Sequence, residues 1–239
     1  EKSDFNKIGI LGAGMMGAGI AHVTAMAGLE VVLLDSTQDA ADKGKSYSEG
    51  LLNKAISRKR MTEEKRDGIL GLINPTTDYA DLAGCDMVIE AVFEDRVIKA
   101  DVTAKTEAVI AEDAIFASNT STLPITGLAE ASGRPANFIG LHFFSPVDKM
   151  PLVEIIMGEK TGDVALARAM DFVKRIRKTP VVVNDSRGFY TSRVFATYVA
   201  EGLALLGEGV KPALIENAGR MAGMPVGPLA LADEVSLTL

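Results

Sequence analysis

Residues 7–17 read KIGILGAGMMG, and this stretch decides the fold. A short apolar run passes directly into a turn with glycines at Gly12, Gly14 and Gly17, the G-x-G-x-x-G spacing. A second apolar run, EVVLL at 30–34, ends at Asp35. Strand, glycine turn, helix, strand and acidic residue in this order are typical of a βαβ unit that binds a dinucleotide. An ordinary βαβ turn is the alternative, because glycine turns alone are common.

Each glycine has a physical role in that interpretation. Gly12 permits the tight turn, Gly14 lets the backbone approach a pyrophosphate, and Gly17 lets the helix pack closely on the sheet. The phosphates are expected at the helix N-terminus, where unpaired N–H groups and the helix dipole favour negative charge.

Asp35 indicates which dinucleotide binds. A carboxylate at the end of the second strand accepts hydrogen bonds from the adenosine ribose hydroxyls and repels a 2′-phosphate. The residues that follow are Ser36, Thr37 and Gln38, none of them basic. The sequence therefore predicts NAD rather than NADP. Asp35 can also cap a helix that begins near Thr37, and the two roles are compatible.

Composition limits the function classes. The chain has 239 residues, is 47% hydrophobic and carries a net charge of −7, which argues against nucleic acid as a partner. Cys85 is the single cysteine, so no internal disulfide forms and a reducing compartment, the cytoplasm or a mitochondrial matrix, is expected. The two histidines are far apart in sequence, and we predict no metal site. No apolar run reaches the ~18 residues of a membrane span, and the opening EKSDFNK does not indicate a cleavable signal.

Alternating apolar runs and amphipathic segments predict an α/β fold with a doubly wound, Rossmann-like parallel sheet. The predicted strands are 7–11, 30–34, 87–92, 114–118, 138–143, 152–156 and 180–183. The predicted helices are 15–27, 38–60, 62–72, 96–111 and 163–177. From Ser186 only helical periodicity returns, at 190–207 and 211–222, and the final GPLALADEVSLTL reads as the start of another helix. We therefore predict a dinucleotide-binding domain at 1–184 and the beginning of a helical domain at 185–239.

His142 and Glu154 are the predicted acid–base pair. His142 ends the run FIGLH, and the carboxyl ends of strands line the ligand crevice in open α/β sheets. Glu154 lies inside the apolar run PLVEII, where a carboxylate is costly unless it is paired. Since the two strands are consecutive, His142 is the expected partner. A carboxylate on one imidazole nitrogen leaves the other free to accept a proton, as metal-free alcohol dehydrogenation requires. A lone histidine among aromatic residues is otherwise usually a satisfied core residue.

Two further polar segments follow predicted strands. Asn119 and Ser121 come directly after AIFAS and are expected to hydrogen-bond the reacting oxygen, unless they only cap a following helix. Glu94 and Lys99 follow MVIEAV, where a solvated charge pair at a helix start is the alternative.

The basic cluster Arg58-Lys59-Arg60 is a candidate for binding the phosphates of a coenzyme A thioester. A solvated helix end, with cations complementing the dipole, is the alternative.

With these motifs in hand, the chain closely resembles the L-3-hydroxyacyl-CoA dehydrogenases, and above all the dehydrogenase part of multifunctional fatty-acid oxidation proteins. ILGAGMMGAGIA, IFASNTSTLPI, GLHFFSPVDKMPLVEII and GFYTSRV carry the resemblance in order along nearly the whole chain. The resemblance implies catalysis by His142 and Glu154 with help from Ser121 and Asn119. It also implies cofactor contacts by the glycine turn and several residues beyond it: Gly12, Gly14, Met15, Met16, Gly17, Asp35, Val92, Glu94, Lys99, Ser121 and Ser145.

The implied substrate is an acyl-CoA thioester in fatty-acid β-oxidation, with Ser121, Ser192, Arg58 and Lys59 as candidate contacts. Relatives usually carry Asn at the position of Ser192, which questions the role of that position here. The resemblance further implies a homodimer, a longer helical domain than this chain contains, an enoyl-CoA hydratase domain upstream and a thiolase partner subunit. Two alternatives are a short-chain 3-hydroxybutyryl-CoA dehydrogenase and an NAD-binding relative without turnover.

Overall fold

The computed structural model describes residues 3–234. These residues divide into two compact units, with the boundary between Asp185 and Ser186. The strands of the first unit are β1 (Lys7–Leu11), β2 (Glu30–Leu34), β3 (Ile73–Thr76), β4 (Met87–Glu90), β5 (Ile115–Ser118), β6 (Phe138–Phe143), β7 (Leu152–Met157) and β8 (Thr179–Asn184). Its α-helices are α1 (Met15–Met26), α2 (Gln38–Ser57), α3 (Glu63–Gly71), α4 (Arg96–Glu107), α5 (Ile125–Leu128) and α6 (Asp163–Arg175). Short 3-10 helices η1 (Tyr79–Leu82), η2 (Ala129–Ala131) and η3 (Pro135–Asn137) connect them.

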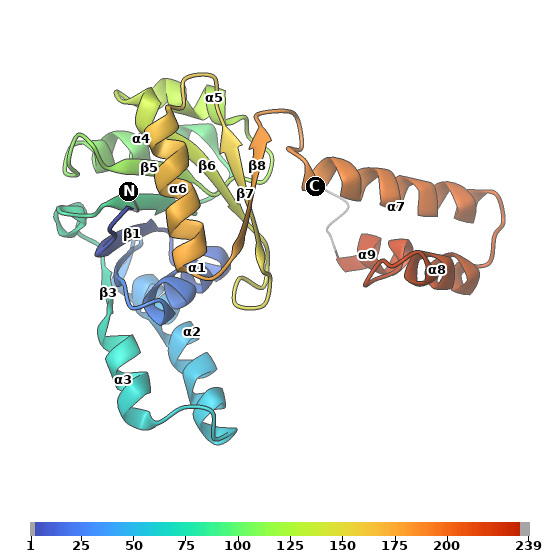
Figure 1. Cartoon of the computed structure of the whole chain (residues 1–239), viewed down its shortest axis with the longest axis horizontal. Helices are drawn as coiled ribbons and strands as arrows, with labels where there is room; N and C mark the ends of the chain where they lie inside the picture. The colour runs from blue at the N-terminus through green and yellow to red at the C-terminus, as the bar shows by residue number, and fades with distance from the viewer. Residues whose placement is uncertain (1–2, 235–239) are drawn as a thin grey trace. The chain divides into compact units, whose positions relative to one another are not determined.

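The strands form one eight-stranded sheet in the order β3-β2-β1-β4-β5-β6-β7-β8 (Figure 1). Buried residues of α1, α2 and α6 share one hydrophobic core with the strands, while α4 contacts α5 and η1. This confirms the predicted Rossmann-like α/β class. The chain order reverses between β1 and β4, which places the ligand crevice at the carboxyl ends of these two strands.

The sheet is mixed: the predicted parallel arrangement holds from β3 to β6 along the sheet, whereas β7 and β8 pair in parallel with each other and run the opposite way. β6 and β7 pair in antiparallel fashion, because the connection at 144–151 is shorter than the dozen or more residues that a parallel crossover needs. The edge strand β3, which reads INPT, was not predicted, because it is short and contains a proline. The predicted helix 38–60 ends earlier, at Ser57, and the backbone is left-handed at Lys59, with φ 55°.

Close packing of α1 on the sheet depends on two of the motif glycines. Gly12 has φ 89°, and a Cβ there would lie 2.6 Å from the backbone oxygen of Ala91, after β4. A Cβ on Gly17 would lie 1.8 Å from the backbone oxygen of Gly12. Any larger residue at either position would therefore push the first turn of α1 away from the carboxyl end of β1.

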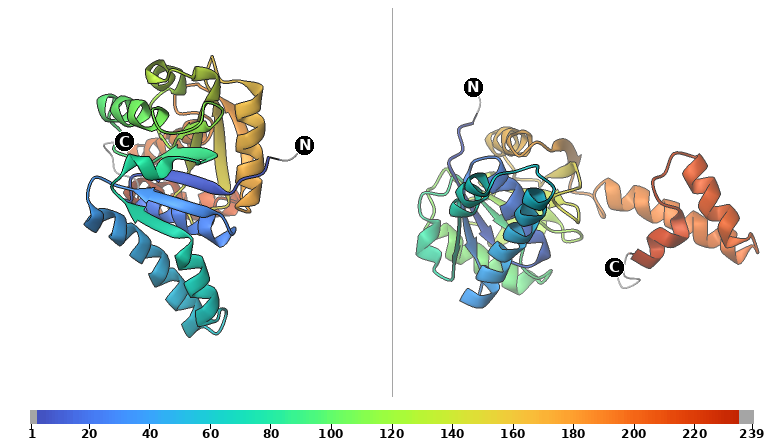
Figure 2. Two further views of the ribbon diagram at one scale, coloured as in Figure 1. Left: turned by 90° about the vertical axis from the view of Figure 1, so that its left-hand side faces the viewer. Right: turned by 90° about the horizontal axis from the view of Figure 1, so that it is seen from below.

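The second unit contains α7 (Thr191–Gly207), α8 (Pro212–Met221) and α9 (Pro228–Glu234), which pack on one another (Figure 2). Pro228 of α9 lies against Gly202 of α7, and the Glu216 carboxylate of α8 accepts hydrogen bonds from two backbone N–H groups in the first turn of α9. The predicted final helix corresponds to α9, and its continuation lies outside the described residues. Over residues 3–234, no helix has the length and apolar character needed to cross a membrane.

Candidate active site

The turn between β1 and α1 lies where a dinucleotide is expected. A Cβ on Gly14 would meet no atom within 4 Å, so this glycine faces open space. No side chain caps the N-terminus of α1. The exposed Met15 begins the helix, and its sulfur lies 3.6 Å from the Ser145 hydroxyl, after β6. Met16, in contrast, packs against the core.

Asp35 closes this turn from the end of β2. Its Oδ2 accepts a hydrogen bond from the Ala13 N–H at 2.7 Å, and its Oδ1 accepts one from the Ser36 N–H at 2.6 Å. Thr37, not Asp35, is the N-cap residue of α2, so the helix-cap alternative was wrong. The carboxylate is therefore held beside the glycine turn.

His142 and Glu154 lie directly opposite each other on β6 and β7. His142 Nδ1 is 2.8 Å from Glu154 Oε2, and Glu154 is fully buried. An ionised carboxylate only accepts, so with Glu154 ionised the Nδ1 atom carries the proton and Nε2 is the unprotonated ring nitrogen. The imidazole ring also packs on Phe144, with ring centroids 4.5 Å apart. Burial, register and hydrogen bonding together fix the orientation of the imidazole.

Asn119 links β5 to the histidine strand. Its Oδ1 accepts a hydrogen bond from the Phe143 N–H at 2.9 Å, next to His142 in the chain. The side-chain amide is thereby oriented, and its NH₂ group is left as a donor. The helix-cap alternative was wrong for Asn119, because α5 begins after Pro124 and the turn is closed by Thr120, whose hydroxyl accepts from the Leu123 N–H.

The Ser121 side chain is exposed, next to this turn. Its backbone N–H and that of Thr122 both donate to Glu94 Oε1, at 2.9 and 3.2 Å. The Thr120 hydroxyl donates to the same oxygen. Burial alone would raise the pKa of Glu94, but the hydrogen bonds from Thr120 and Ser121 and the nearby Lys99 ammonium outweigh it and lower that pKa. Glu94 therefore holds the turn after β5 as a carboxylate.

Lys99 is buried, so the alternative of a solvated charge pair was wrong. Its Nζ lies 3.2 Å from Glu94 Oε2 and 2.7 Å from Glu90 Oε1. The exposed fractions of the Lys99 and Glu90 side chains are 2% and 1%. Val92 joins this cluster by donating its backbone N–H to Glu90 Oε1 at 2.9 Å. Five strand ends, those of β1, β2, β4, β5 and β6, thus carry most of the predicted cofactor and catalytic residues, while Glu154 lies within β7.

Glu90 did not stand out in the sequence, although a signal was present. It lies inside the apolar run MVIEAV, as Glu154 lies inside PLVEII. The rule that a carboxylate in an apolar strand needs a partner applies to both positions. In β4 the partner is Lys99, nine residues further along the chain, which is separated from the strand by a loop.

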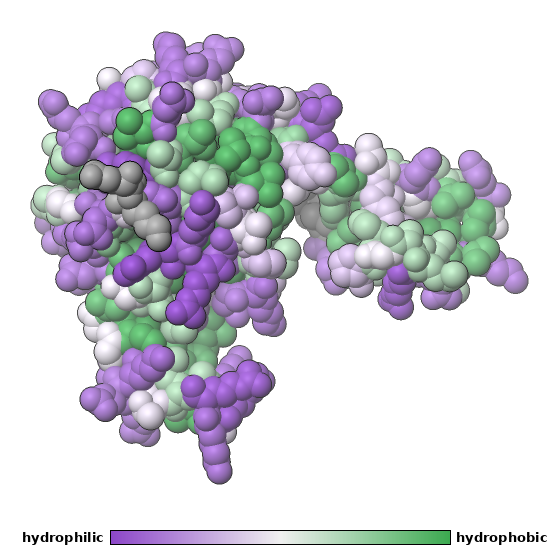
Figure 3. Space-filling model, in the orientation of Figure 1, coloured by the Kyte–Doolittle hydropathy of each residue, from purple (hydrophilic) through white to green (hydrophobic). Residues whose placement is uncertain are grey.

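The remaining predicted substrate residues lie elsewhere. Arg58 and Lys59 are exposed at the turn between α2 and α3, where hydrophilic side chains gather at the end of a projecting hairpin (Figure 3). The structure does not bring them beside His142. Ser192 begins α7 in the second unit and is partly buried there.

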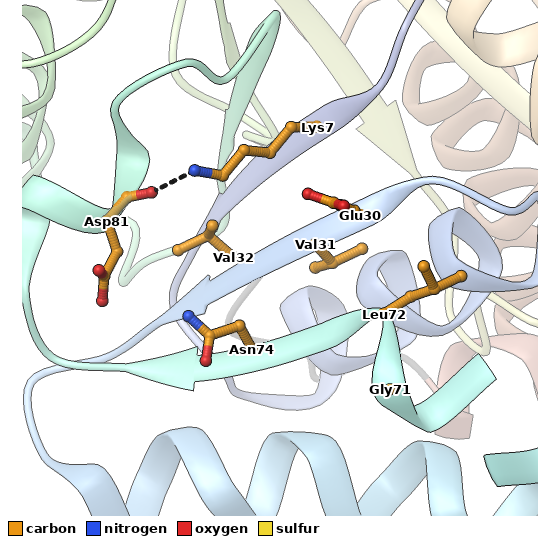
Figure 4. Close-up of a pocket in the computed structure, with 8 residues that line it drawn as sticks. All are labelled: Lys7, Glu30, Val31, Val32, Gly71, Leu72, Asn74 and Asp81. Carbon is orange, nitrogen blue, oxygen red and sulfur yellow. Dashed lines mark hydrogen bonds between the residues drawn. The ribbon is translucent and has the colours of Figure 1, made fainter. Parts of the chain in front are cut away.

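A hollow in the first unit lies away from these residues. It measures about 280 Å³ and lies at the amino ends of β1 and β2, lined by Lys7 and Glu30, the first residues of those strands (Figure 4). The Lys7 ammonium is already held there by the backbone oxygens of Asp81 and Ala83, each at 2.8 Å. This hollow is at the opposite end of the parallel strands from the glycine turn and carries none of the predicted chemistry.

These features define a class of protein. The glycine turn leaves space that a Cβ would fill, the helix N-terminus has no side-chain cap, and Asp35 lies at the end of β2. This donor set fits NAD. The fold and the glycine turn are therefore those of an NAD-binding, Rossmann-like protein, with a buried imidazole–carboxylate pair at the same edge of the sheet.

Comparison with known proteins specifies the class further. Residues 7–186 match the family described as 3-hydroxyacyl-CoA dehydrogenase, NAD binding domain, and residues 188–239 match the C-terminal domain of the same family. The chain therefore belongs to the 3-hydroxyacyl-CoA dehydrogenase family, and its cofactor is NAD. The predicted family resemblance is confirmed.

Three relatives illustrate the similarity. The fatty acid oxidation complex subunit alpha of Shewanella halifaxensis is 43% identical over 238 residues, which is 99% of this chain and 34% of the relative. The (S)-3-hydroxybutyryl-CoA dehydrogenase of Ralstonia eutropha is 38% identical, with a TM-score of 0.93, over 97% of this chain and 82% of that one. The dehydrogenase part of multifunctional enzyme 1 from C. elegans is 29% identical, with a TM-score of 0.74, over 98% and 54%. The chain spans about a third of the length of the curated relatives it matches.

Proposed function

We propose that this protein oxidises L-3-hydroxyacyl-CoA thioesters to 3-ketoacyl-CoA in fatty-acid oxidation, with His142 as the general base and Glu154 as its partner. The observation that carries the proposal is the 2.8 Å contact between His142 Nδ1 and the buried Glu154 carboxylate, at the end of the sheet that holds the glycine turn. The family match and the fatty acid oxidation subunits among the relatives support the reaction class.

The chain's own groups account for the proton. Nε2 of His142 accepts the proton of the C3 hydroxyl, and the imidazolium is then stabilised by the Glu154 carboxylate on Nδ1–H. The bound NAD supplies the hydride acceptor. Asn119 and Ser121 are proposed to hydrogen-bond the substrate oxygen, the former through the NH₂ group that its contact with Phe143 leaves available.

Cofactor and substrate contacts form the second part of the proposal. The glycine turn and Asp35 would hold the pyrophosphate and ribose, and Glu94 and Lys99 are further proposed cofactor contacts. The exposed Arg58 and Lys59 are proposed to pair with coenzyme A phosphates, although their position at a helix end also fits the solvated alternative. Ser192 is proposed to contact the acyl part of the substrate. We further propose that the protein forms a homodimer, that a hydratase domain and a thiolase subunit accompany it, and that it acts in the cytoplasm or a mitochondrial matrix. Relatives named as subunits of a fatty acid oxidation complex support this proposal.

His142→Gln tests the function. The amide cannot accept and release a proton as imidazole does, so kcat is expected to fall by about 10²–10⁴. Steady-state NADH formation from L-3-hydroxyacyl-CoA measures kcat, and calorimetry with NAD is expected to show nearly unchanged affinity. Turnover near the wild-type rate would contradict the mechanism.

A short-chain substrate is the second candidate, because two relatives with TM-scores of 0.93 are named 3-hydroxybutyryl-CoA dehydrogenases. Comparison of kcat/KM for four-carbon and long-chain 3-hydroxyacyl-CoA thioesters separates the candidates. A steady rise with chain length favours the β-oxidation assignment, and a maximum at four carbons favours the alternative.

A further inference from the structure

The buried Glu90 of β4 has a set of contacts that the proton chemistry does not use. Its Oε1 lies 2.7 Å from Lys99 Nζ and accepts the Val92 N–H, and its Oε2 accepts the Ser118 hydroxyl at 2.7 Å. These contacts fix both carboxylate oxygens. A carboxylate that is 1% exposed is costly to bury unless such partners compensate for its lost hydration.

Lys99 connects the buried Glu90 to Glu94, which is partly exposed at the end of β4. Its ammonium lies between two carboxylates, Glu90 in the core and Glu94 at the mouth of β4. Glu94 Oε2 faces Lys99. Glu94 Oε1 accepts hydrogen bonds from the Thr120 hydroxyl and from the N–H groups of Ser121 and Thr122. A continuous series of polar contacts therefore runs from the core of β4, through α4, to the turn after β5.

We infer that Glu90 is a positioning residue for NAD binding: its negative charge holds Lys99 at a depth that lets Glu94 fix the Ser121–Thr122 turn. An ammonium has three N–H donors, and its contacts to Glu90 and Glu94 leave one for a ligand. Without the charge on Glu90, Glu94 is the remaining carboxylate beside Lys99. The ammonium then draws Glu94 away from the turn. The inference rests on the proposed contacts of Glu94 and Lys99 with the cofactor, but not on dehydrogenase turnover.

Glu90→Gln isolates the charge. The amide oxygen can still accept from Lys99 and Val92, and the amide NH₂ can donate to Ser118, whose hydroxyl also accepts. We expect the Kd for NAD to rise by about tenfold or more, the scale of one hydrogen bond to a charged group. In the protein without NAD, hydrogen exchange at the Ser121 and Thr122 amides is expected to be faster, because both donate to Glu94.

Glu107→Gln is the matched control. Glu107 lies at the other end of α4, where its carboxylate accepts the Ser132 hydroxyl and the Gly133 N–H. Its replacement changes stability through a similar loss of charge-assisted hydrogen bonds but leaves NAD affinity unchanged. A comparable rise in Kd for Glu107→Gln would show that Glu90 acts only through general stability and would overturn the inference.

A double-mutant cycle with Lys99→Met identifies the pathway. If Glu90 acts through Lys99, Glu90→Gln adds no further rise in Kd once Lys99 is absent, whereas full additivity overturns the inference. An NAD affinity of Glu90→Gln within about twofold of wild type also overturns it.

If Glu90→Gln does not fold, Ser118→Ala replaces it as the test, because it removes the hydrogen bond to Glu90 Oε2. Ser118→Ala is expected to weaken NAD binding severalfold, and an unchanged Kd would refute the inference. Wild-type protein that binds NAD without oxidising the thioester refutes the proposed function alone.

Discussion

Glu154→Gln separates the charge of the catalytic pair from its geometry. The Glu154 carboxylate is fully buried and lies 2.8 Å from His142 Nδ1, so solvent does not compensate for the loss of its charge. Glutamine has almost the same shape, and its amide oxygen can accept the same Nδ1–H bond. The imidazole therefore keeps its tautomer and position, while the negative charge beside it is lost.

The expected effect follows from the charge that develops on His142. When Nε2 takes the substrate proton, the imidazolium and the carboxylate form an ion pair with charge centres about 4 Å apart. At the effective dielectric constant of about 20 that suits protein sites, such a pair is worth about 4 kcal/mol. Since about 1.4 kcal/mol changes a rate tenfold, kcat is expected to fall by about 10³.

The assay compares kcat and NAD affinity of Glu154→Gln with those of wild type. Glu107→Gln, an acid-to-amide change at the far end of α4, controls for lost stability. If Glu154→Gln keeps kcat within about threefold of wild type, the carboxylate only orients the ring, and the electrostatic reasoning based on the coupling energy of ~4 kcal/mol is refuted.

Three other changes test separate parts of the structure. Asp35→Ala is expected to raise the Kd for NAD about tenfold, by loss of a charged hydrogen-bond acceptor, and to narrow the preference over NADP; equal calorimetric affinities of wild type for the two cofactors would contradict the assignment. Burial lowers the pKa of His22 from its ordinary value of 6.5, despite the nearby Asp148. The unfolded state therefore binds more protons than the folded state, so the free energy of unfolding falls as pH drops from 6.5 through the pKa of His22 in the folded protein. Urea unfolding at neutral and mildly acidic pH should show a smaller acid loss for His22→Gln, and an equal loss would disprove this linkage. Gly17→Ala places a Cβ 1.8 Å from a backbone oxygen and is expected to cost at least about 1–3 kcal/mol of stability; an unchanged melting temperature would show that α1 moves freely.

The part of the fold that follows from local sequence was predictable. The spacing of Gly12, Gly14 and Gly17 predicts the turn between the first strand and the first helix, and Asp35 follows at the end of the next strand. The edge strand β3 escaped detection because INPT has neither alternation nor an apolar run. The direction of β7 depends on the short connection after β6, a property of chain length rather than of residue type.

The part of the site that follows from the cost of burying a charge was predictable. A carboxylate inside an apolar strand needs a partner, and the preceding strand places His142 opposite Glu154. The roles of Asn119 and Lys99 could not be resolved in the same way, because both residues have ordinary positions at a strand end or helix start. Their side chains turn inward, toward the Phe143 N–H and the Glu90 carboxylate, and only the packing of neighbouring strands decides this.

Two buried carboxylates therefore organise the two halves of the proposed site by the same physical rule. Glu154 on β7 fixes an imidazole, and Glu90 on β4 fixes an ammonium, each at less than 3 Å. The burial of each charge is unfavourable alone, so the chain retains it only with a partner in a fixed place. Asn119 lies between these halves and joins the end of β5 to the backbone of β6. Because hydrogen bonds hold His142, Lys99 and Asn119 in place, the proposed proton acceptor and cofactor-binding residues are oriented before either ligand arrives, which reduces the reorganisation that the reaction requires.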